Sequence, residues 1–460
     1  SSSPLAMNQS ELGDRKALRS IATDGKSENE FDIEWGGFLT NHLSHGQWAL
    51  DTLGAKYELR ETYTRLYKER LCIANEDGNK INSVEELLEL QGQRRDFLPQ
   101  KKFFQEEISH HGAGKTISIH LPSLIHGLAG AALHPIIHIA VGILSKKEDV
   151  IAEGLAYLNH SYLAPIDTCN TNVTDHDQEN IAAASRHRRE QVAANAVDAA
   201  LAKTPSAPLA MSGRFQRAMG GLLSDAKSVH ALRDEAHAQI PLDVSSDNAV
   251  VDTKTNNTKY TYIDRLFIHI LRIYVGTGSN DYFLLHGLHC AFSLQVIFDE
   301  YPSLPTKVKM DGSNALKLAL VATEWIQGYQ AILHDWKEPW ERITDSAKQD
   351  LSPPLLMEKA SKWIEGRIQS LLDEDASVPR NEHVYKCAAM CNISICRMIE
   401  ERSNADIFNN ELECQKTIDL CAAVDLCMSC DFYGRGIGEK PTKAVDISLE
   451  HFLMHQLVLE

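Results

Sequence analysis

The chain of 460 residues lacks the basic surface that binding to nucleic acid requires. It carries 46 lysines and arginines against 63 aspartates and glutamates, a formal net charge of −17. Neutralising nucleic-acid phosphates takes a cluster of lysine and arginine, and the sequence shows none. We therefore expect no nucleic-acid partner and assign the acidic excess to the solubility of helix surfaces.

A disulfide framework and a secretory signal are also missing. Seven of the ten cysteines fall between Cys387 and Cys430, without the regular spacing of a small secreted domain. The first 30 residues, Ser1 to Glu30, are polar and lack the apolar core of a signal peptide. These absences favour reduced thiols and a cytoplasmic location.

One long uncharged run is present, from Leu121 to Leu144, and its 24 residues would be long enough to cross a bilayer. It also contains His126, His134 and His138, which a lone spanning helix would have to bury in lipid. We predict a buried helix or helix pair here and no transmembrane span.

Strand-like alternation, internal repeats and heptads are not evident, whereas apolar spacings of three and four recur through most of the chain. We predict an all-α protein with a flexible tail at 1–30 and a single large helical domain at 31–460. An Ala-rich, polar stretch within 167–259 is predicted to be peripheral or inserted. The helices are expected at 31–54, 57–72, 84–90, 146–160, 266–275, 283–298, 315–332, 354–372, 384–400 and 417–430, with an irregular signal between 73 and 118 outside the short 84–90 helix.

Four histidine-bearing segments carry most of the chemistry. Each sets two nitrogen-bearing side chains three or four residues apart, so that each pair would share one helix face. A lone histidine on an apolar face is more often a hydrogen-bonded core residue than a ligand. Burying several neutral imidazoles is costly unless each finds a partner, and one divalent metal would satisfy them together. The segments are His42 with His45, His134 with His138, His286 with His289, and His383 with Lys386.

The last segment has two interpretations. Glu382 and Lys386 stand at i and i+4, the favourable order for an exposed helix ion pair. Alternatively, His383 and Lys386 both turn inward. A buried lysine has a lowered pKa, and its neutral amine can react with carbon dioxide to become an oxygen-donor ligand.

Several short motifs of the chain resemble motifs of the questin oxidase-like family and follow one another in the same order as in that family. The resemblance extends over about Phe31 to Met398. Members of that family are helical, and characterised ones open the rings of fungal aromatic polyketides oxidatively. One member cleaves anthraquinones with a non-heme iron held by four histidines and a carboxylated lysine. The motifs are Trp35-Gly36-Gly37-Phe38-Leu39-x-Asn41-His42 with Leu53-Gly54-Ala55, His134-Pro135-x-Ile137-His138, Leu285-His286-Gly287, and Glu382-His383-Val384-x-Lys386.

The resemblance implies a metal-ligand set and a second group of histidines beside it. The implied ligands of an Fe(II) ion are His42, His134, His286, His383 and a carboxylated Lys386. The neighbouring His45, His138 and His289 are predicted to orient ligands or to act as general bases toward the substrate. Leu288-His289-Cys290 stands where the family usually has a Val-Thr pair, so the substrate is not carried over.

Five protein ligands on an octahedral iron would leave one position for dioxygen. We therefore predict an oxygenase that cleaves or oxygenates a small phenolic or quinone-type compound. One alternative is an NADPH-dependent Baeyer-Villiger-type oxidase of the same family. Another is a non-catalytic helical protein whose histidines bind structural zinc or merely pack. The sequence leaves the NADPH requirement and the oligomeric state open.

Overall fold

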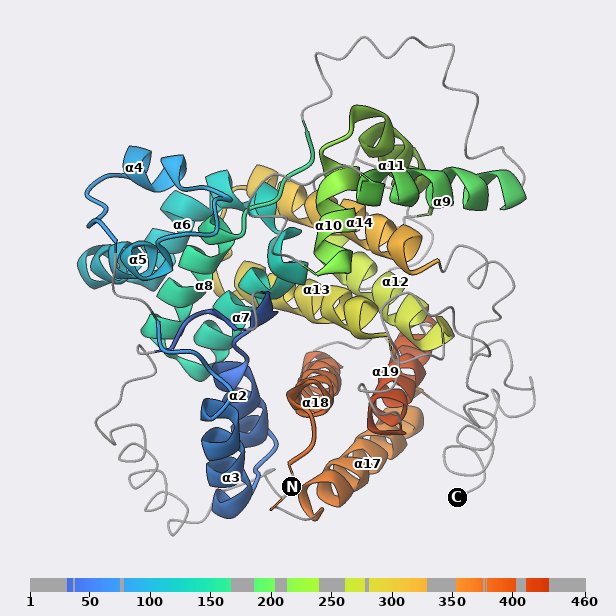
Figure 1. The fold of residues 1–460 in the computed structure, drawn as a ribbon. Coiled ribbons are helices and arrows are strands. Elements are labelled where there is room, and N and C mark those ends of the chain that lie inside the picture. The colour runs from blue at the N-terminus through green and yellow to red at the C-terminus, as the bar shows by residue number, and fades with distance from the viewer. Residues whose placement is uncertain are drawn as a thin grey trace.

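The computed structural model describes residues 31–35, 38–74, 78–166, 186–202, 213–239, 261–277, 281–328, 353–374, 377, 379–402 and 411–429, and these are mostly α-helical (Figure 1). The predicted all-α class is confirmed. The first half contains β1 (Glu34–Trp35), β2 (Leu39–Thr40), α2 (Leu43–Thr52), α3 (Tyr57–Lys68), α4 (Val84–Glu89), α5 (Phe97–His111), α6 (Ala113–Leu124), the short 3₁₀ helices η2 (Ile125–Gly127) and η3 (Gly130–Leu133), α7 (His134–Ser145) and α8 (Glu148–His160).

The second half contains α9 (Arg186–Ala202), α10 (Arg214–Leu223), α11 (Ala226–Gln239), α12 (Tyr262–Thr277), α13 (Tyr282–Glu300), α14 (Thr306–Gln327), α17 (Pro353–Leu372), α18 (Glu382–Arg402) and α19 (Glu411–Ser429). The predicted tail at 1–30 lies outside the described residues, as do large parts of 167–259. The division into tail, domain and inserted segment stays a prediction.

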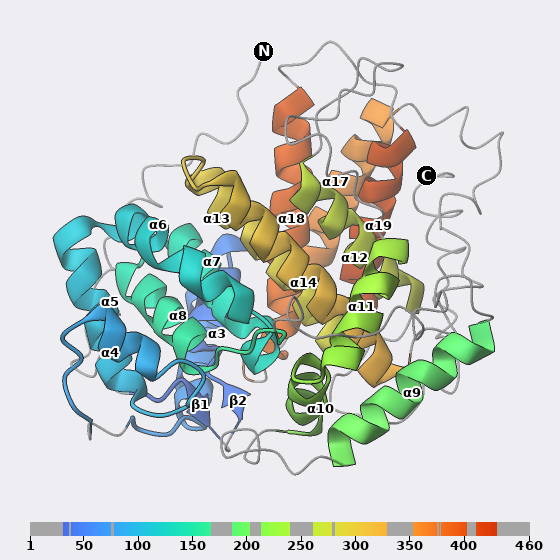
Figure 2. The same cartoon turned by 90° about the horizontal axis from the view of Figure 1, so that it is seen from above.

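Helix α13 lies at the centre of the molecule, between α7 on one side and α12 and α14 on the other (Figure 2). Every residue from Leu284 to Phe298 is buried, because this helix is apolar around nearly its whole circumference. The side chain of Asp281 accepts hydrogen bonds from the backbone N–H groups of Phe283 and Leu284 and so caps the helix start. That cap fixes where the first turns of α13 enter the core.

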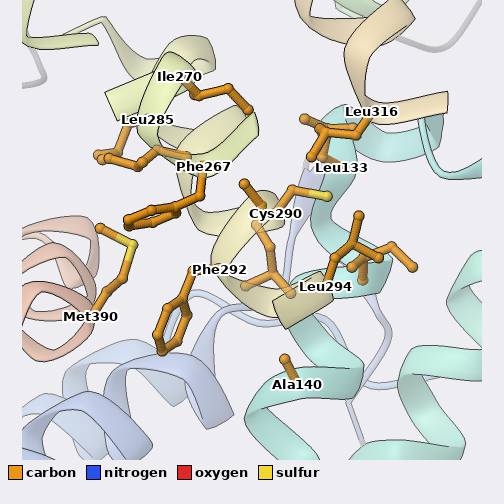
Figure 3. Packing of buried hydrophobic residues seen from close by; sticks show 14 of the residues in the cluster. Leu133, Ala140, Phe267, Ile270, Leu285, Cys290, Phe292, Leu294, Leu316 and Met390 are labelled. Carbon is orange, nitrogen blue, oxygen red and sulfur yellow. The ribbon is translucent and has the colours of Figure 1, made fainter. Parts of the chain in front are cut away.

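The hydrophobic core surrounds α13 and joins all its neighbours. Phe267 and Ile270 of α12 contact it from one side, and Leu316 of α14 and Leu133 lie on the other (Figure 3). Met390 of α18 packs against the same cluster. Helices α7, α12, α14 and α18 therefore all pack against α13.

Helices α7 and α8 approach each other more closely than side chains would ordinarily allow. A Cβ on Gly142 would lie 2.7 Å from the backbone nitrogen of Ile151, and one on Gly154 would lie 2.7 Å from that of Ile139. Glycine at both positions removes this clash. It brings the face of α7 that carries His138 against the face of α8 that carries Glu153.

The uncharged run from Leu121 to Leu144 is divided between the end of α6, two short 3₁₀ helices and α7. The predicted helix pair is confirmed. Within the described part of the chain, no helix is long and apolar enough to span a membrane.

Two details of the secondary structure differ from expectation. The predicted helix at 31–54 begins only at Leu43, because Glu34–Trp35 and Leu39–Thr40 pair as a short antiparallel ribbon. Two-residue strands are too short to produce visible alternation. Helices α5 and α6 occupy much of the stretch that gave an irregular signal; each contains a proline, Pro99 and Pro122 respectively.

A candidate metal centre

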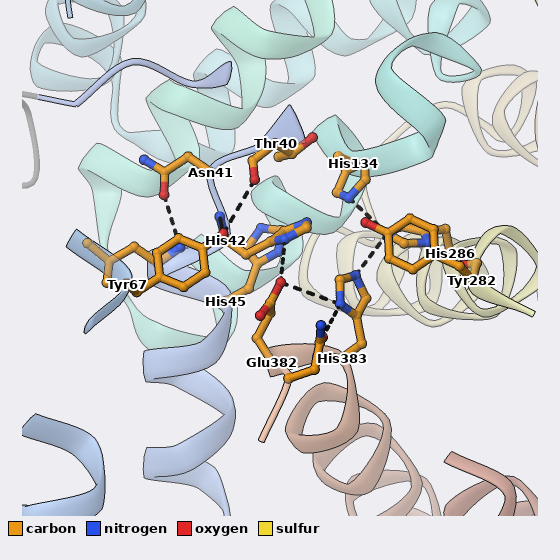
Figure 4. Close-up of polar contacts among 12 residues, drawn as sticks. Thr40, Asn41, His42, His45, Tyr67, His134, Tyr282, His286, Glu382 and His383 are labelled. Atoms are coloured by element: carbon orange, nitrogen blue, oxygen red, sulfur yellow. Dashed lines mark hydrogen bonds and ion pairs between the residues drawn. The ribbon is translucent and has the colours of Figure 1, made fainter. Parts of the chain in front are cut away.

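Four of the predicted ligands lie together in the core. The ring nitrogens that His42, His134, His286 and His383 can offer all lie within 4.8 Å of one another, and all four side chains are buried. The Nε2 atom of His286 is 2.8 Å from that of His134 and 3.1 Å from that of His383. The four rings come from distant parts of the sequence and face one point (Figure 4).

His42 immediately precedes α2 and is held by side chains of α3. Its backbone N–H donates to the Tyr67 hydroxyl at 2.9 Å, and its carbonyl accepts from the Tyr63 hydroxyl at 3.1 Å. The Asn41 side chain accepts from the N–H of Leu43 at 3.0 Å, which starts the helix. The position of the His42 ring is thus fixed by both flanking segments.

His134 follows three consecutive residues in the left-handed region. Ala131, Ala132 and Leu133 have φ of 46°, 52° and 71°. Non-glycine residues in this region are strained by about 1 kcal/mol or more each. The turn directs the carbonyl of Ala131 at the His134 ring, whose Nδ1 donates to it at 2.5 Å. Strain here coincides with the orientation of a candidate ligand.

His286 lies in the second turn of α13, and His383 lies in the first turn of α18. The Nδ1 of His286 donates to the carbonyl of Tyr282 at 2.5 Å. The Oδ1 atom of Asn381 accepts from the backbone N–H of His383 at 2.9 Å and from its Nδ1 at 2.7 Å. Local backbone and side-chain acceptors therefore orient both rings.

The acceptors determine where each ring carries its proton. Backbone carbonyls, the Asn381 oxygen and the Glu382 carboxylate, which lies 2.9 Å from Nδ1 of His42, can only accept. Each neutral imidazole must therefore carry its proton on Nδ1 and leave a lone pair on Nε2. Four Nε2 lone pairs then face one another without a proton between them.

Such an arrangement fits a bound cation. Facing lone pairs 2.8 Å apart repel each other, and Nε2 of His42 has no hydrogen-bond partner within the described residues. Two nitrogens at neighbouring positions around a metal, with bonds of about 2.1 Å, are separated by about 3 Å. Imidazole nitrogens suit iron, zinc, copper and nickel, so the donor set alone does not distinguish these metals.

The pKa values agree with neutral ligands. Burial and the charge of Lys386 together lower the pKa of His134 to about 3, although the hydrogen bond to the carbonyl of Ala131 opposes the shift. Burial, together with the charges of neighbouring groups that include Lys386, holds the pKa of His42, His286 and His383 well below the ordinary value. All four rings are unprotonated near neutral pH, the state in which imidazole binds metals.

Lys386 lies one turn beyond His383 on α18 and is 1 % exposed. Its Nζ has no hydrogen-bond partner among the residues that the structure describes, and Glu382 is hydrogen-bonded to His42 instead. The interpretation of Lys386 as an exposed ion-pair partner of Glu382 is therefore wrong, and the interpretation of Lys386 as a buried side chain is confirmed. Burial lowers the pKa of Lys386 to about 8, although Glu382 and Cys427 oppose the shift.

The other three predicted residues lie beside this group but in different settings. The His45 ring is 5.2 Å from that of His42, and its Nε2 is 2.9 Å from Nδ1 of His138. His289 is one turn after His286, with 6.4 Å between their rings. In the described part of the chain, neither ring nitrogen of His289 has a hydrogen-bond partner.

Sequence reasoning missed the acceptors behind the histidines. The carbonyls of Ala131 and Tyr282 carry no side-chain signal, so no motif could have indicated them. Glu382 and Asn381 were visible beside His383 but were assigned to the helix surface or passed over. A carboxylate or amide next to a candidate ligand is the signal that was available.

The family to which the chain belongs follows from a sequence match that covers most of its length. A sequence model of the family described as questin oxidase-like matches residues 39–387. The chain belongs to the questin oxidase-like family. The match contains all four converging histidines and Lys386, and membership of a questin oxidase-like family indicates an oxidoreductase. No curated protein matches the chain.

Proposed function

We propose that this questin oxidase-like chain is a non-heme iron oxygenase that uses dioxygen to cleave or oxygenate a phenolic or quinone-type aromatic compound. The convergence of four unprotonated Nε2 atoms among buried side chains carries the proposal. Family membership supports iron over zinc, because the family's name describes an oxidase and zinc has no redox chemistry.

His42, His134, His286 and His383 would hold the metal, and Lys386 would add an oxygen ligand once its amine is carboxylated. A redox-active iron with an open position would supply dioxygen activation. The pKa of Lys386, about 8, leaves a larger neutral fraction for reaction with carbon dioxide than an exposed lysine has.

Residues around the metal would exclude water and bind the substrate. The Tyr282 ring lies 4.2 Å from that of His286 and 4.7 Å from that of His383, which covers this side of the group. His289 offers two buried ring nitrogens with no hydrogen-bond partner in the described residues. A phenolic hydroxyl could satisfy one of them.

Metal analysis and oxygen uptake test this function. Protein purified without oxygen should contain about one iron per chain and should consume oxygen when given 1,8-dihydroxyanthraquinone without NADPH. The His383→Ala and Lys386→Ala variants should lose iron and uptake together. His120→Gln is the matched control, since His120 is equally buried but lies 3.1 Å from Glu107, away from the four histidines.

Three results would contradict the proposal. Stoichiometric zinc without oxygen uptake would indicate a structural site, and absence of any bound metal would indicate packed histidines. Uptake that requires NADPH would favour a Baeyer-Villiger-type oxidase. Full uptake by either alanine variant with unchanged iron would exclude the assigned ligands.

A further inference from the structure

A second buried chain of polar groups starts beside the four histidines. Nε2 of His45 lies 2.9 Å from Nδ1 of His138, and Nε2 of His138 lies 2.9 Å from Oε2 of Glu153. The other carboxylate oxygen, Oε1, accepts from Nζ of Lys101 at 3.0 Å. All four side chains are buried, with exposures of 0, 1, 7 and 2 % from His45 to Lys101.

The carboxylate sets the direction of every hydrogen bond in this chain. Burial alone would raise the pKa of Glu153, but the charge of Lys101 and the hydrogen bond from His138 outweigh it and lower the pKa to about 2. An ionised carboxylate only accepts, so His138 must donate from Nε2. Its Nδ1 is then an acceptor, and His45 must donate from Nε2.

These hydrogen-bond directions determine the protonation state of Nδ1 of His45. A neutral imidazole that carries its proton on Nε2 has a lone pair on Nδ1. Nδ1 of His45 is buried and has no hydrogen-bond partner among the described residues. The His45 ring lies next to the ring of His42, one of the candidate ligands.

We propose that Glu153 and Lys101 are positioning residues that fix the tautomers of His138 and His45, so that Nδ1 of His45 serves as the general base for the substrate. This inference rests on the proposed oxygenase function. The inference gives the two histidines different roles. Both ring nitrogens of His138 are hydrogen-bonded, to His45 and Glu153, whereas Nδ1 of His45 remains able to accept a proton.

The proton transfer balances within the site. The O–H bond of a phenolic substrate breaks and an N–H bond forms at Nδ1 of His45, which leaves a phenolate and an imidazolium. The imidazolium donates through Nε2 to His138, and the negative charge of Glu153 behind that ring stabilises it. This is the role a buried carboxylate has behind a catalytic histidine in other enzymes.

Glu153→Gln tests the direction of the chain. Lys101 can only donate, so it holds the amide oxygen toward itself and turns the amide N–H₂ group toward His138. Both tautomers must then reverse, and Nδ1 of His45 gains a proton. The ¹⁵N NMR signals of histidine-labelled, full-length protein report this directly, since protonated and unprotonated ring nitrogens resonate far apart.

A double variant provides the matched control. In Glu153→Gln/Lys101→Met nothing holds the amide orientation, so its oxygen can turn toward His138 and restore the original tautomers. The expected sequence is an unprotonated His45 Nδ1 in the natural protein, a protonated one in the single variant and recovery in the double variant. Thermal unfolding of each variant verifies that the fold is retained.

Activity provides a second readout. With 1,8-dihydroxyanthraquinone, kcat for oxygen uptake should fall about 10²- to 10⁴-fold in Glu153→Gln, with KM and iron content little changed, and should recover in part in the double variant. A protonated His45 Nδ1 in the natural protein, or tautomers unchanged by Glu153→Gln, would overturn the inference. The NMR readout needs neither iron nor turnover, so its failure is distinct from failure of the proposed oxygenase.

Discussion

Nδ1 of His42 lies 2.9 Å from a carboxylate oxygen of Glu382, although 340 residues separate them in the chain. This bond joins the first of the converging segments to the last. Burial raises the pKa of Glu382 and the charge of Lys386 opposes that rise, so the bond to His42 also depends on its charged neighbours.

Replacing Glu382 should weaken metal binding without unfolding the protein. Carboxylates behind metal-bound histidines typically contribute about 10- to 100-fold in affinity, and we expect a loss of that size for Glu382→Gln. Iron(II) titration of the metal-free protein measures it. Glu374→Gln is the control, because Glu374 pairs with Arg380 nearer the surface. Equal affinities in the two variants would show that Glu382 does not support the ligand.

Lys386→Met should separate stability from function. Burial lowers the pKa of Lys386 to about 8 from an ordinary 10.5, which corresponds to roughly 3 kcal/mol of unfavourable interaction at neutral pH. In the metal-free state the variant should therefore have a free energy of unfolding about 1 to 3 kcal/mol higher in urea titrations. After addition of iron it should show no oxygen uptake. Lys317→Met is the comparison, since Lys317 is also buried and has a pKa near 8 but belongs to α14. Its oxygen uptake should be unchanged.

Short carboxylic acids should restore part of the activity to Lys386→Ala. Acetate or propionate can supply the oxygen ligand that a carboxylated lysine would provide, in the space that the shortened side chain leaves. Uptake measured against acid concentration should rise and saturate, while chloride at equal ionic strength has no effect. A flat response together with intact iron binding would mean that Lys386 contributes no ligand.

The metal-free protein should lose stability as the solution becomes more acidic. Histidines in the unfolded chain titrate near pH 6.5, whereas burial lowers the pKa of His134 and His160 in the fold to about 3. Below pH 6.5 the unfolded state binds more protons than the folded state. The free energy of unfolding therefore decreases as the pH is lowered. The loss between pH 6.5 and 5.5 should be about 1 kcal/mol or more in urea titrations.

Glu324 partly offsets this loss of stability at acidic pH. Burial raises the pKa of Glu324 to about 8, so its contribution to stability grows as pH falls from 8 toward 4.5. The histidines outnumber it, and their sum should dominate. Stability that rises between pH 6.5 and 5.5 would contradict the lowered histidine pKa values.

Ala132→Gly should not destabilise the protein as it would in a helix. Ala132 has φ of 52°, where glycine is not strained, so we expect an unchanged free energy of unfolding or a gain of up to about 1 kcal/mol. The same change at the exposed Ala194 of α9 should cost about 1 kcal/mol. Chemical denaturation of both variants makes the comparison, and equal losses would argue against strain before His134.

The sequence predicted the helical class from its apolar periodicity. Spacing marked eight candidate side chains, and the resemblance to the questin oxidase-like family selected the four histidines that converge. The 3.6-residue period showed where apolar faces lie, and paired nitrogen side chains marked His134, His286 and His383. What it could not predict depends on tertiary approach. The carbonyl of Ala131 becomes an acceptor only through three left-handed residues, none of which is a glycine.

The partners of His45 and His138 were unpredictable for a similar reason. The two histidines were expected beside the ligands, facing the substrate. Their partners Glu153 and Lys101 come from α8 and α5 and reach His138 only after these helices pack. Lys101 lay in a stretch with no clear periodicity, and a buried lysine has no signature in composition. Close helix packing at Gly154 brings the groups together.

The order of the four histidines along the chain also constrains how the protein matures. His42, His134, His286 and His383 are spread so widely that 341 residues must be added after His42 before the fourth imidazole exists. A chain that ends before His383 therefore cannot assemble the set. If the four histidines bind a metal, such incomplete chains would not capture the ion through the full site.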